Sequence, residues 1–410
     1  MSLELLQREW QKFLGEDGIR IATEASAPSH QENILNKYSE QCGIRGSCHY
    51  LLSSQFEQCG LLDSDRSNFS LVLAHAMSRS VTAMQTAQIP ASESAVLVGL
   101  SPYKFFGAEV MKAQHGYIVL VSPVTFSFCF LFALLSVISA QATGLMEQGL
   151  VPRDENGNAL IDSFNWTYCS HHALDSAVEE FMETGGILAP HEKVAFARFD
   201  LLPWHYIERV QRTYEQMLDF LILHEFGHIW LGHMGRMPAV RRAVPLTSTS
   251  YEVASPLPLQ EEAADDFALK CLVAQDDPEE LNKFVSLLQS GNLQSSEWDN
   301  LFLGRSSISR YTSALQLLKL FDLFDNHSVS HANKARFTNS CEINGTHPSG
   351  QHRFLRAMFG DGSPAFTLSS GYRFNKSSFL SWSNWTSLRV SRRPAEDVYR
   401  EARKLGMVSG

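Results

Sequence analysis

The pentapeptide His224-Glu225-Phe226-Gly227-His228 constrains the fold more than any other part of the sequence. It follows the apolar run of residues 217–223, and before Gly232 only the small Gly227 disfavours a helix, which is expected to begin near residue 206 and to end near residue 232. Residues four apart on a helix lie on the same face. The segment therefore predicts one long helix on which His224 and His228 direct their imidazole rings toward a common point.

Two histidines and a glutamate in this pattern are typical of the zinc site of a peptidase. His224 and His228 would bind the metal ion, and Glu225, one residue round the helix, would take a proton from a metal-activated water molecule. The alternative is a buried helix whose polar side chains bind one another without a metal. Because burying polar groups without partners is costly, the sequence favours zinc.

Residues 261–272 predict a second helix that carries the third metal ligand. Its apolar stripe has the spacing i, i+3, i+4, i+7, i+8 and consists of Ala264, Phe267, Ala268, Cys271 and Leu272. Extended back by one turn, this stripe reaches Glu261, which is therefore expected on the buried face. A metal ion explains a carboxylate in that place, so Glu261 is the predicted third ligand, with Glu262 as the alternative.

Asp265 lies one turn beyond Glu261 and next to the same stripe. A carboxylate there is expected to accept the free N–H of a ligating histidine, which fixes the tautomer and the orientation of the ring. The acidic residues of this turn also have a simpler explanation, because the helix dipole stabilises solvent-exposed carboxylates at a helix N-terminus. That explanation suits Glu262 and Asp266 best, whereas the buried face favours Glu261 for the metal.

An uncharged stretch between residues 116 and 140 is the one candidate for a membrane span in the sequence. Its first part, residues 116–121, has the composition of a strand, and Ser122 and Pro123 suit the N-cap and the first position of a helix. The helix that remains is shorter than the roughly 20 residues that a bilayer requires. A buried strand followed by a buried helix is the favoured interpretation, and a membrane anchor is the alternative.

The bulk composition argues against a nucleic-acid-binding protein. The net charge is −10 and the isoelectric point is near 5.8, whereas neutralising phosphates requires a surplus of Lys and Arg. The seven cysteines are scattered without a C-x-x-C pair, which indicates free thiols in a reducing compartment. Cys42, Cys48 and Cys59 with His49 fit no standard zinc finger. Because residues 1–10 resemble an amphipathic helix rather than a signal peptide, we expect a cytoplasmic protein.

The 410-residue chain is long enough for two or three domains. We predict an α+β fold with a helical N-terminal extension at residues 1–95, a metallopeptidase domain at residues 96–360 and a C-terminal capping segment at residues 361–410. Residues 234–258 contain several prolines and a Ser/Thr cluster, so they predict a long loop between the two helices of the metal site.

Four elements of the sequence resemble the gluzincin peptidases of the HtpX and CAAX-prenyl-endopeptidase type, and they follow one another along the chain as they do in that family. The two main ones are His224-Glu225-x-x-His228-x-x-x-x-His233 and Glu261-x-x-Ala264-Asp265-x-Phe267-Ala268. Residues 116–121 resemble the edge strand of that family, and Thr346-His347-Pro348-Ser349 with Arg353 resembles its late Thr-His-Pro…Arg element. The resemblance spans residues 100–360.

Some other groups of zinc peptidases share the motif of this chain, and others differ from it in identifiable features. The phage-exclusion protease Lit and its relatives, and peptidases of the ImmA/IrrE type, carry a similar H-E-x-x-H motif followed by a downstream glutamate. The integral-membrane gluzincins carry several hydrophobic spans, whereas this chain has at most one. The metzincin pattern is absent, because Leu231 stands at its glycine position and Met234 at its third histidine.

The resemblance implies a zincin-like core and a zinc endopeptidase that cleaves a protein or peptide substrate. His224, His228 and Glu261 would bind zinc, and Glu225 would be the general base. His347 and His233 are the candidates for stabilising the oxyanion, and strand 117–121 would bind the substrate backbone as an added strand. Kinship with Lit implies cleavage of a specific host protein in phage defence. The alternative function is a zinc-stabilised sensor or binding module with a vestigial peptidase site.

Overall fold

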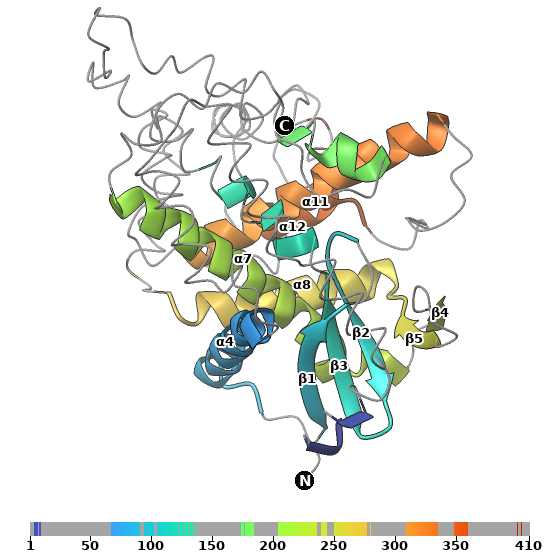
Figure 1. Cartoon of the computed structure of the whole chain (residues 1–410). Coiled ribbons are helices and arrows are strands. Elements are labelled where there is room, and N and C mark those ends of the chain that lie inside the picture. The colour runs from blue at the N-terminus through green and yellow to red at the C-terminus, as the bar shows by residue number, and fades with distance from the viewer. Residues whose placement is uncertain are drawn as a thin grey trace, which may run out of the picture.

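The computed structural model shows a mixed α and β fold (Figure 1). Its described part is mostly helical and contains one small sheet. The described residues are mainly 67–90, 94–101, 105–122, 204–235, 239–243, 250–276, 309–334 and 348–359, with parts of 4–9, 124–136 and 174–183 and positions 279, 400 and 403. The predicted α+β class is thus confirmed for this part of the chain. The predicted capping segment, residues 361–410, lies outside it apart from two positions.

The sheet has five strands in the order β1-β3-β2-β5-β4. The strands are β1 (Ala95–Leu100), β2 (Ala108–Ala113), β3 (Gly116–Val121), β4 (Ala239–Ala243) and β5 (Ser250–Ala254). β3 pairs in parallel with β1 and antiparallel with β2, so partners occupy both of its edges. The expectation that strand 117–121 is an edge strand that adds a substrate strand is therefore wrong. Its β-branched residues predicted the strand but carry no information about its neighbours.

The hairpin between β2 and β3 requires glycine at position 116. Gly116 has φ of +154°, and a Cβ on it would lie 2.1 Å from the carbonyl oxygen of Ala95. The register aligns Ala95 with Gly116, which lets β1 and β3 approach at this point. A glycine therefore starts β3 where any side chain would collide with its parallel neighbour.

Residues 234–258 contain two strands, so the prediction of a long loop there is wrong. β4 and β5 pair antiparallel with each other, and Met111 of β2 pairs with Val253 of β5. Tyr251 and Val253 bury their side chains with Met111, Ile118 and Leu120 on one face of the sheet. Apolar residues in alternate positions of β5 thus contribute to a core that the prolines and the Ser/Thr cluster do not reveal.

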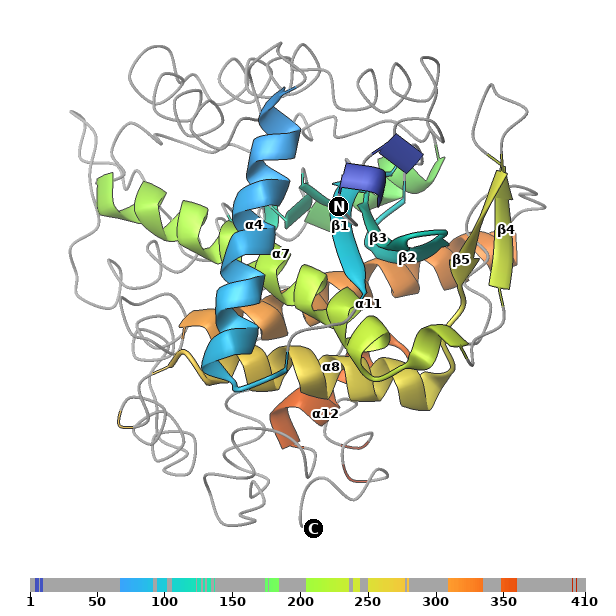
Figure 2. The ribbon, with the colours of Figure 1, turned by 90° about the horizontal axis from the view of Figure 1, so that it is seen from below.

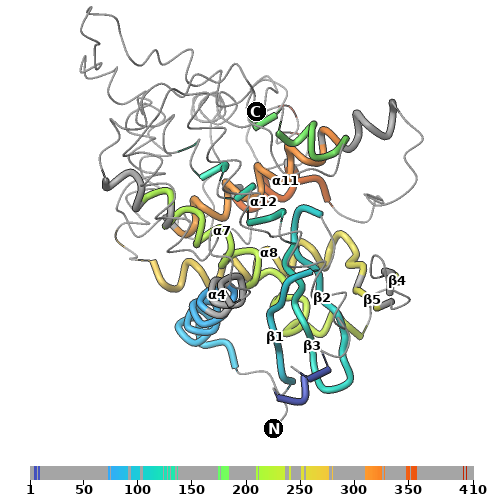
Figure 3. Tube along the Cα trace, in the orientation of Figure 1, coloured from blue at the N-terminus to red at the C-terminus, as the bar shows by residue number. Residues whose placement is uncertain are grey.

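In the described part of the chain, five long helices pack together beside the sheet. They are α4 (Ser67–Thr86), α7 (Trp204–Trp230), α8 (Pro258–Val273), α11 (Ser309–Lys334) and α12 (Gly350–Phe359). α7 contacts α4, α8 and α11 as well as β2 and β3, and Figure 2 shows α4 crossing it. α12, late in the chain, lies against α8 and α11 (Figure 3). The predicted helix over residues 206–232 is confirmed within two residues at each end.

Arg79 of α4 and Asp219 of α7 fix these two helices to each other. Arg79 Nε donates to both carboxylate oxygens of Asp219, at 3.0 and 2.9 Å. Asp219 is buried, so the guanidinium offsets the cost of removing its charge from water. This pair fixes α7 near the middle of the helix, at Asp219, which precedes His224 in the sequence.

α8 begins three residues before Glu261, earlier than the acidic turn suggested. Pro258 occupies its first turn, where a missing N–H costs nothing, and Gln260 Oε1 accepts the N–H of Leu257 at 2.8 Å. Glu261 is therefore already inside the helix and belongs to its buried side, together with Ala264 and Asp265. The early start gives Glu261 a fixed backbone.

α7 and α8 cross closely at Gly227 and Ala264. A Cβ on Gly227 would lie 3.0 Å from Ala264 Cα and 3.2 Å from its carbonyl oxygen. Small residues on both helices allow this approach, which ridge-and-groove packing of larger side chains would prevent. The crossing brings the face of α7 that carries the two histidines against the first turns of α8.

In the residues that the structure describes, no helix combines the length and the apolar character needed to cross a membrane. The predicted buried strand is confirmed, because β3 is a strand and Ile118 to Leu120 are fully buried. Helical residues follow from Val124, and Val124, Phe126 and Phe128 are also fully buried. The uncharged stretch thus begins as core of the sheet and of the helix beside it.

Candidate metal centre

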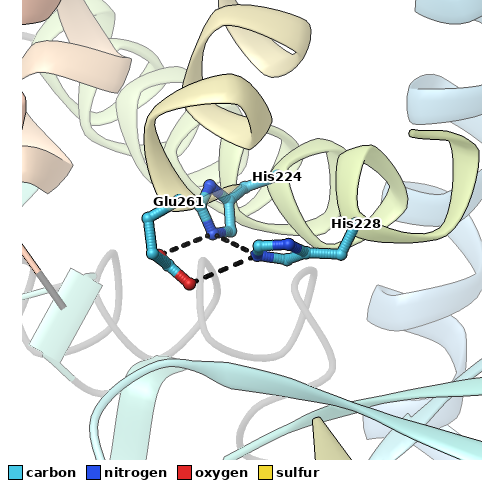
Figure 4. A group of neighbouring side chains, drawn as sticks. All are labelled: His224, His228 and Glu261. Atoms are coloured by element: carbon cyan, nitrogen blue, oxygen red, sulfur yellow. Dashed lines mark hydrogen bonds and ion pairs between the residues drawn. The ribbon is translucent and has the colours of Figure 1, made fainter. Parts of the chain in front are cut away.

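Three buried side chains from two helices converge on one point (Figure 4). His224 and His228 come from successive turns of α7, and Glu261 comes from α8. Their exposed fractions are 4%, 2% and 2%. The structure therefore brings the two histidines and the predicted third ligand together, in a place that water reaches poorly.

Four donor atoms of these three side chains lie close together. His224 Nε2 lies 3.2 Å from His228 Nε2. His224 Nε2 lies 3.3 Å from Glu261 Oε2, and His228 Nε2 lies 3.3 Å from Glu261 Oε1. A tetrahedral ion with bonds of about 2.0–2.1 Å holds its donor atoms about 3.3–3.4 Å apart. Each histidine nitrogen lies at about this spacing from the other nitrogen and from one oxygen of Glu261, so the three side chains could hold a metal ion.

Each histidine is also held from behind, through its other ring nitrogen. His224 Nδ1 lies 2.9 Å from Asp265 Oδ1, and because a carboxylate only accepts, the nitrogen donates. His228 Nδ1 lies 3.1 Å from His233 Nδ1, in the short helix η2 (His233–Gly235). These contacts orient both rings with Nε2 toward Glu261, as ligating histidines are commonly oriented.

The negative charge of the site favours a cation. Burial opposes a charge on His224, but the carboxylates of Glu261 and Asp265 outweigh it and raise the pKa of His224 to about 10. At His228 burial prevails, assisted by the charge on His224, and lowers the pKa to about 4. Glu261 and Asp265 therefore stabilise a positive charge where the three side chains meet.

Asp265 is bound by a buried arginine from α12. Arg353 Nε donates to Asp265 Oδ2 at 2.8 Å, and Arg353 Nη2 donates to Oδ1 at 2.7 Å. Burial opposes ionisation of Asp265, but the guanidinium outweighs it and lowers the pKa of Asp265 to about 2. Asp265 is therefore a permanent carboxylate that accepts from His224 and from Arg353 together.

Glu225 is buried next to His224 and is 6% exposed. Burial is the main cause that raises the pKa of Glu225 to about 7, with the charges of Glu261 and Glu109 adding to it and that of His224 opposing it. A carboxyl whose pKa lies near neutrality can both accept and release a proton at physiological pH. This is the property that a general base beside a metal centre requires.

Glu262, the alternative third ligand, points to other partners. Its two carboxylate oxygens bind Arg356 and His352 of α12, the latter at 3.1 Å. Arg356 also donates to Asp266, the other acidic residue of this turn. Both residues are partly exposed, in keeping with the simpler explanation of an acidic first turn.

The two histidines proposed for the oxyanion have different outcomes. His233 contacts the Nδ1 side of His228, so it lies behind a ligand rather than beside the open position of the site. His347 lies outside the described residues, which resume at Pro348. Sequence reasoning did not assign Arg353 a partner, although it noted the residue in the late Thr-His-Pro…Arg element. Glu109, whose charge helps to raise the pKa of Glu225, was not predicted as part of the site. The sequence shows it as an acidic residue in a short segment that forms β2.

No family model, no curated protein and no solved structure matches this chain. The geometry gives a buried group of two histidines and one glutamate that could hold a metal ion, with a buried carboxyl of raised pKa next to it.

Proposed function

We propose that this protein is a zinc-dependent endopeptidase, with α7, α8 and the sheet forming a zincin-like core. The observation that carries the proposal is the buried convergence of His224, His228 and Glu261, whose histidine nitrogens lie 3.2 Å apart and each 3.3 Å from one oxygen of Glu261. Two histidines and one glutamate are a donor set of catalytic zinc sites, and they leave one position open. Zinc bound there supplies a Lewis acid that activates water and polarises a carbonyl group.

In this proposal Glu225 moves the proton. It accepts the proton of the attacking water as the new C–O bond forms, and it releases this proton to the amine nitrogen as the C–N bond breaks. A pKa of about 7 suits both transfers, because neither state of the carboxyl is strongly favoured at neutral pH. His224 and Glu261 are held by their own contacts, with Asp265 and with Arg353 respectively.

The proposed substrate is a protein or a peptide. The resemblance to Lit-like proteases extends the proposal to a specific host protein cleaved during phage defence. The alternative is a zinc-stabilised sensor or binding module in which the same ligands hold zinc and Glu225 has no catalytic task. The two hypotheses share the metal and differ in Glu225, so the metal and the glutamate are tested separately.

The metal ligands are tested by the metal content of the purified protein, measured by inductively coupled plasma mass spectrometry. We expect about one zinc per chain in the wild type and a content near zero in Glu261→Ala, because two histidines alone bind zinc weakly. Glu262→Ala is the matched control on the same turn and should retain its zinc, since Glu262 binds Arg356 and His352 instead. Wild-type protein without zinc, prepared without chelators, would refute the proposal.

The catalytic step is tested with Glu225→Gln, which keeps the shape of the side chain but cannot take a proton. We expect zinc content to stay at the wild-type level and proteolysis to fall by about 10²–10⁴-fold, the usual contribution of general-base catalysis. New protein N-termini that appear in a cell extract incubated with each form, identified by mass spectrometry, give the readout. Identical N-termini and rates for both forms would support the binding module instead.

A further inference from the structure

Arg353 is the buried cation closest to the metal centre among the described residues, and it comes from a separate element. It is 7% exposed and lies on α12, which begins long after α7 and α8 in the sequence. Its two donors bind both oxygens of Asp265 at 2.7 and 2.8 Å, and its Nη1 lies 3.8 Å from Glu261 Oε2. One side chain of α12 is therefore beside two acidic residues of the site.

The fork of the guanidinium fixes the plane of the Asp265 carboxylate. A bidentate arginine contacts both oxygens in one geometry, whereas a lysine ammonium binds as a point charge. Because Oδ1 of the same carboxylate accepts from His224 Nδ1, the plane of the carboxylate determines where the His224 ring points. An unbroken series of contacts thus leads from Arg353 through Asp265 to the metal-binding Nε2 of His224.

α12 is itself held in place by α11. Tyr311 OH donates to the carbonyl of Ala357 at 2.8 Å, and the N–H of Gly350 donates to Asp325 Oδ2 at 2.6 Å. A Cβ on Gly350 would lie 2.2 Å from the backbone nitrogen of Asp322, so the start of α12 touches the backbone of α11. The position of the Arg353 guanidinium is therefore set by a rigid support and not by the acidic residues alone.

We propose that Arg353 is a positioning residue of the metal centre, which raises metal affinity by orienting His224 through Asp265. The inference rests on the proposed function, because it concerns the same site. In this role Arg353 contributes to the affinity for the metal ion and takes no part in the chemical step. Arg353 donates to Asp265 and does not itself bind the metal.

Arg356 provides a matched control on the same helix. It lies one turn further along α12 and binds Glu262 and Asp266, the two acidic residues of α8 that face away from the metal centre. Arg356→Met removes an arginine, a charge and two α8–α12 contacts, as Arg353→Met does. The two variants differ in whether the lost contact leads to His224.

The test measures the zinc dissociation constant of the full-length protein by competition with a chromophoric chelator. We expect Arg353→Met to weaken zinc binding by about 10–100-fold, the usual cost of losing a residue that orients a ligand, and Arg356→Met to change it by less than about threefold. Arg353→Lys keeps the charge but not the fork, so it should also lose affinity. The absorption spectrum of the cobalt-substituted protein should change in Arg353→Met and stay unchanged in Arg356→Met.

A double-mutant cycle shows whether Arg353 acts through Asp265. If it does, Asp265→Asn with Arg353→Met should bind zinc no more weakly than the worse of the two single variants. Additive losses, or a folded Arg353→Lys with wild-type zinc affinity and cobalt spectrum, would overturn this inference. Wild-type protein that binds no zinc would instead refute the proposed function, so the two failures are distinct. Arg353→Lys also serves where Arg353→Met does not fold.

Discussion

His224 and His228 lie on one face of α7, yet they differ in their affinity for a proton. His224 is near two carboxylates and has a pKa of about 10 in spite of its burial, whereas burial lowers the pKa of His228 to about 4. At pH 7, before a metal ion binds, His224 is therefore a charged imidazolium with a proton on both ring nitrogens, and His228 is a neutral imidazole. A metal ion that binds both Nε2 nitrogens has to displace the proton on Nε2 of His224.

We predict that zinc binding at pH 7 releases about one proton per chain. Because the folded-state pKa of His224 lies above 7, raising the pH removes the competing proton, and zinc affinity should increase up to about pH 10. Isothermal titration calorimetry in buffers of different ionisation enthalpy measures the number of protons released. A binding enthalpy that is equal in all buffers, with an affinity independent of pH, would contradict the assignment of the proton to His224.

At the scale of elements, the candidate metal centre depends on how closely α7 and α8 cross. Gly227 lies between His224 and His228 in the sequence of α7 and faces Ala264 of α8. Ala264 lies between Glu261 and Asp265 in the sequence of α8, and all three are buried. The ligand atoms of two helices are 3.3 Å apart because the backbones meet here without side chains between them. Glycine in the middle of a helix costs about 1 kcal/mol relative to alanine, and the close crossing offsets this cost.

We predict that Gly227→Val lowers both stability and zinc content. Its Cβ alone would lie 3.0 Å from Ala264 Cα, and the added methyl groups force the helices apart, which costs about 1–3 kcal/mol of unfolding free energy. Gly235→Val is the control, since no atom lies within 4 Å of a Cβ at Gly235. Urea unfolding and metal content measured on both variants check this. Equal zinc content in Gly227→Val and the wild type would show that the crossing is adjustable.

At the scale of the whole molecule, the sequence of a single segment predicted the helix or strand that the segment forms and the face that it buries. The apolar run without helix-breaking residues predicted α7, and the stripe from Ala264 to Leu272 placed Glu261 on the buried side of α8, where the structure has it. The β-branched and aromatic residues at 116–121 predicted β3. In each case the composition or the spacing of neighbouring residues is a local property of the sequence.

Features that arise between segments were not predictable in this way. β2, Ala108–Ala113, contains alanine, glutamate and lysine, which are depleted in strands, and it is a strand because β3 and β5 pair with it. The interior position of β3 follows from this pairing. The contact of Arg353 with Asp265 joins residues 88 positions apart, and no periodicity relates them.

That separation along the chain also orders events during synthesis. Ribosomes add about 5–20 residues per second, so Asp265 is made roughly 4–18 s before the arginine that neutralises it, 88 residues later. The bidentate contact between Arg353 and Asp265 can therefore form only after α12 has been translated, when the residues of α7 and α8 have already left the site of synthesis.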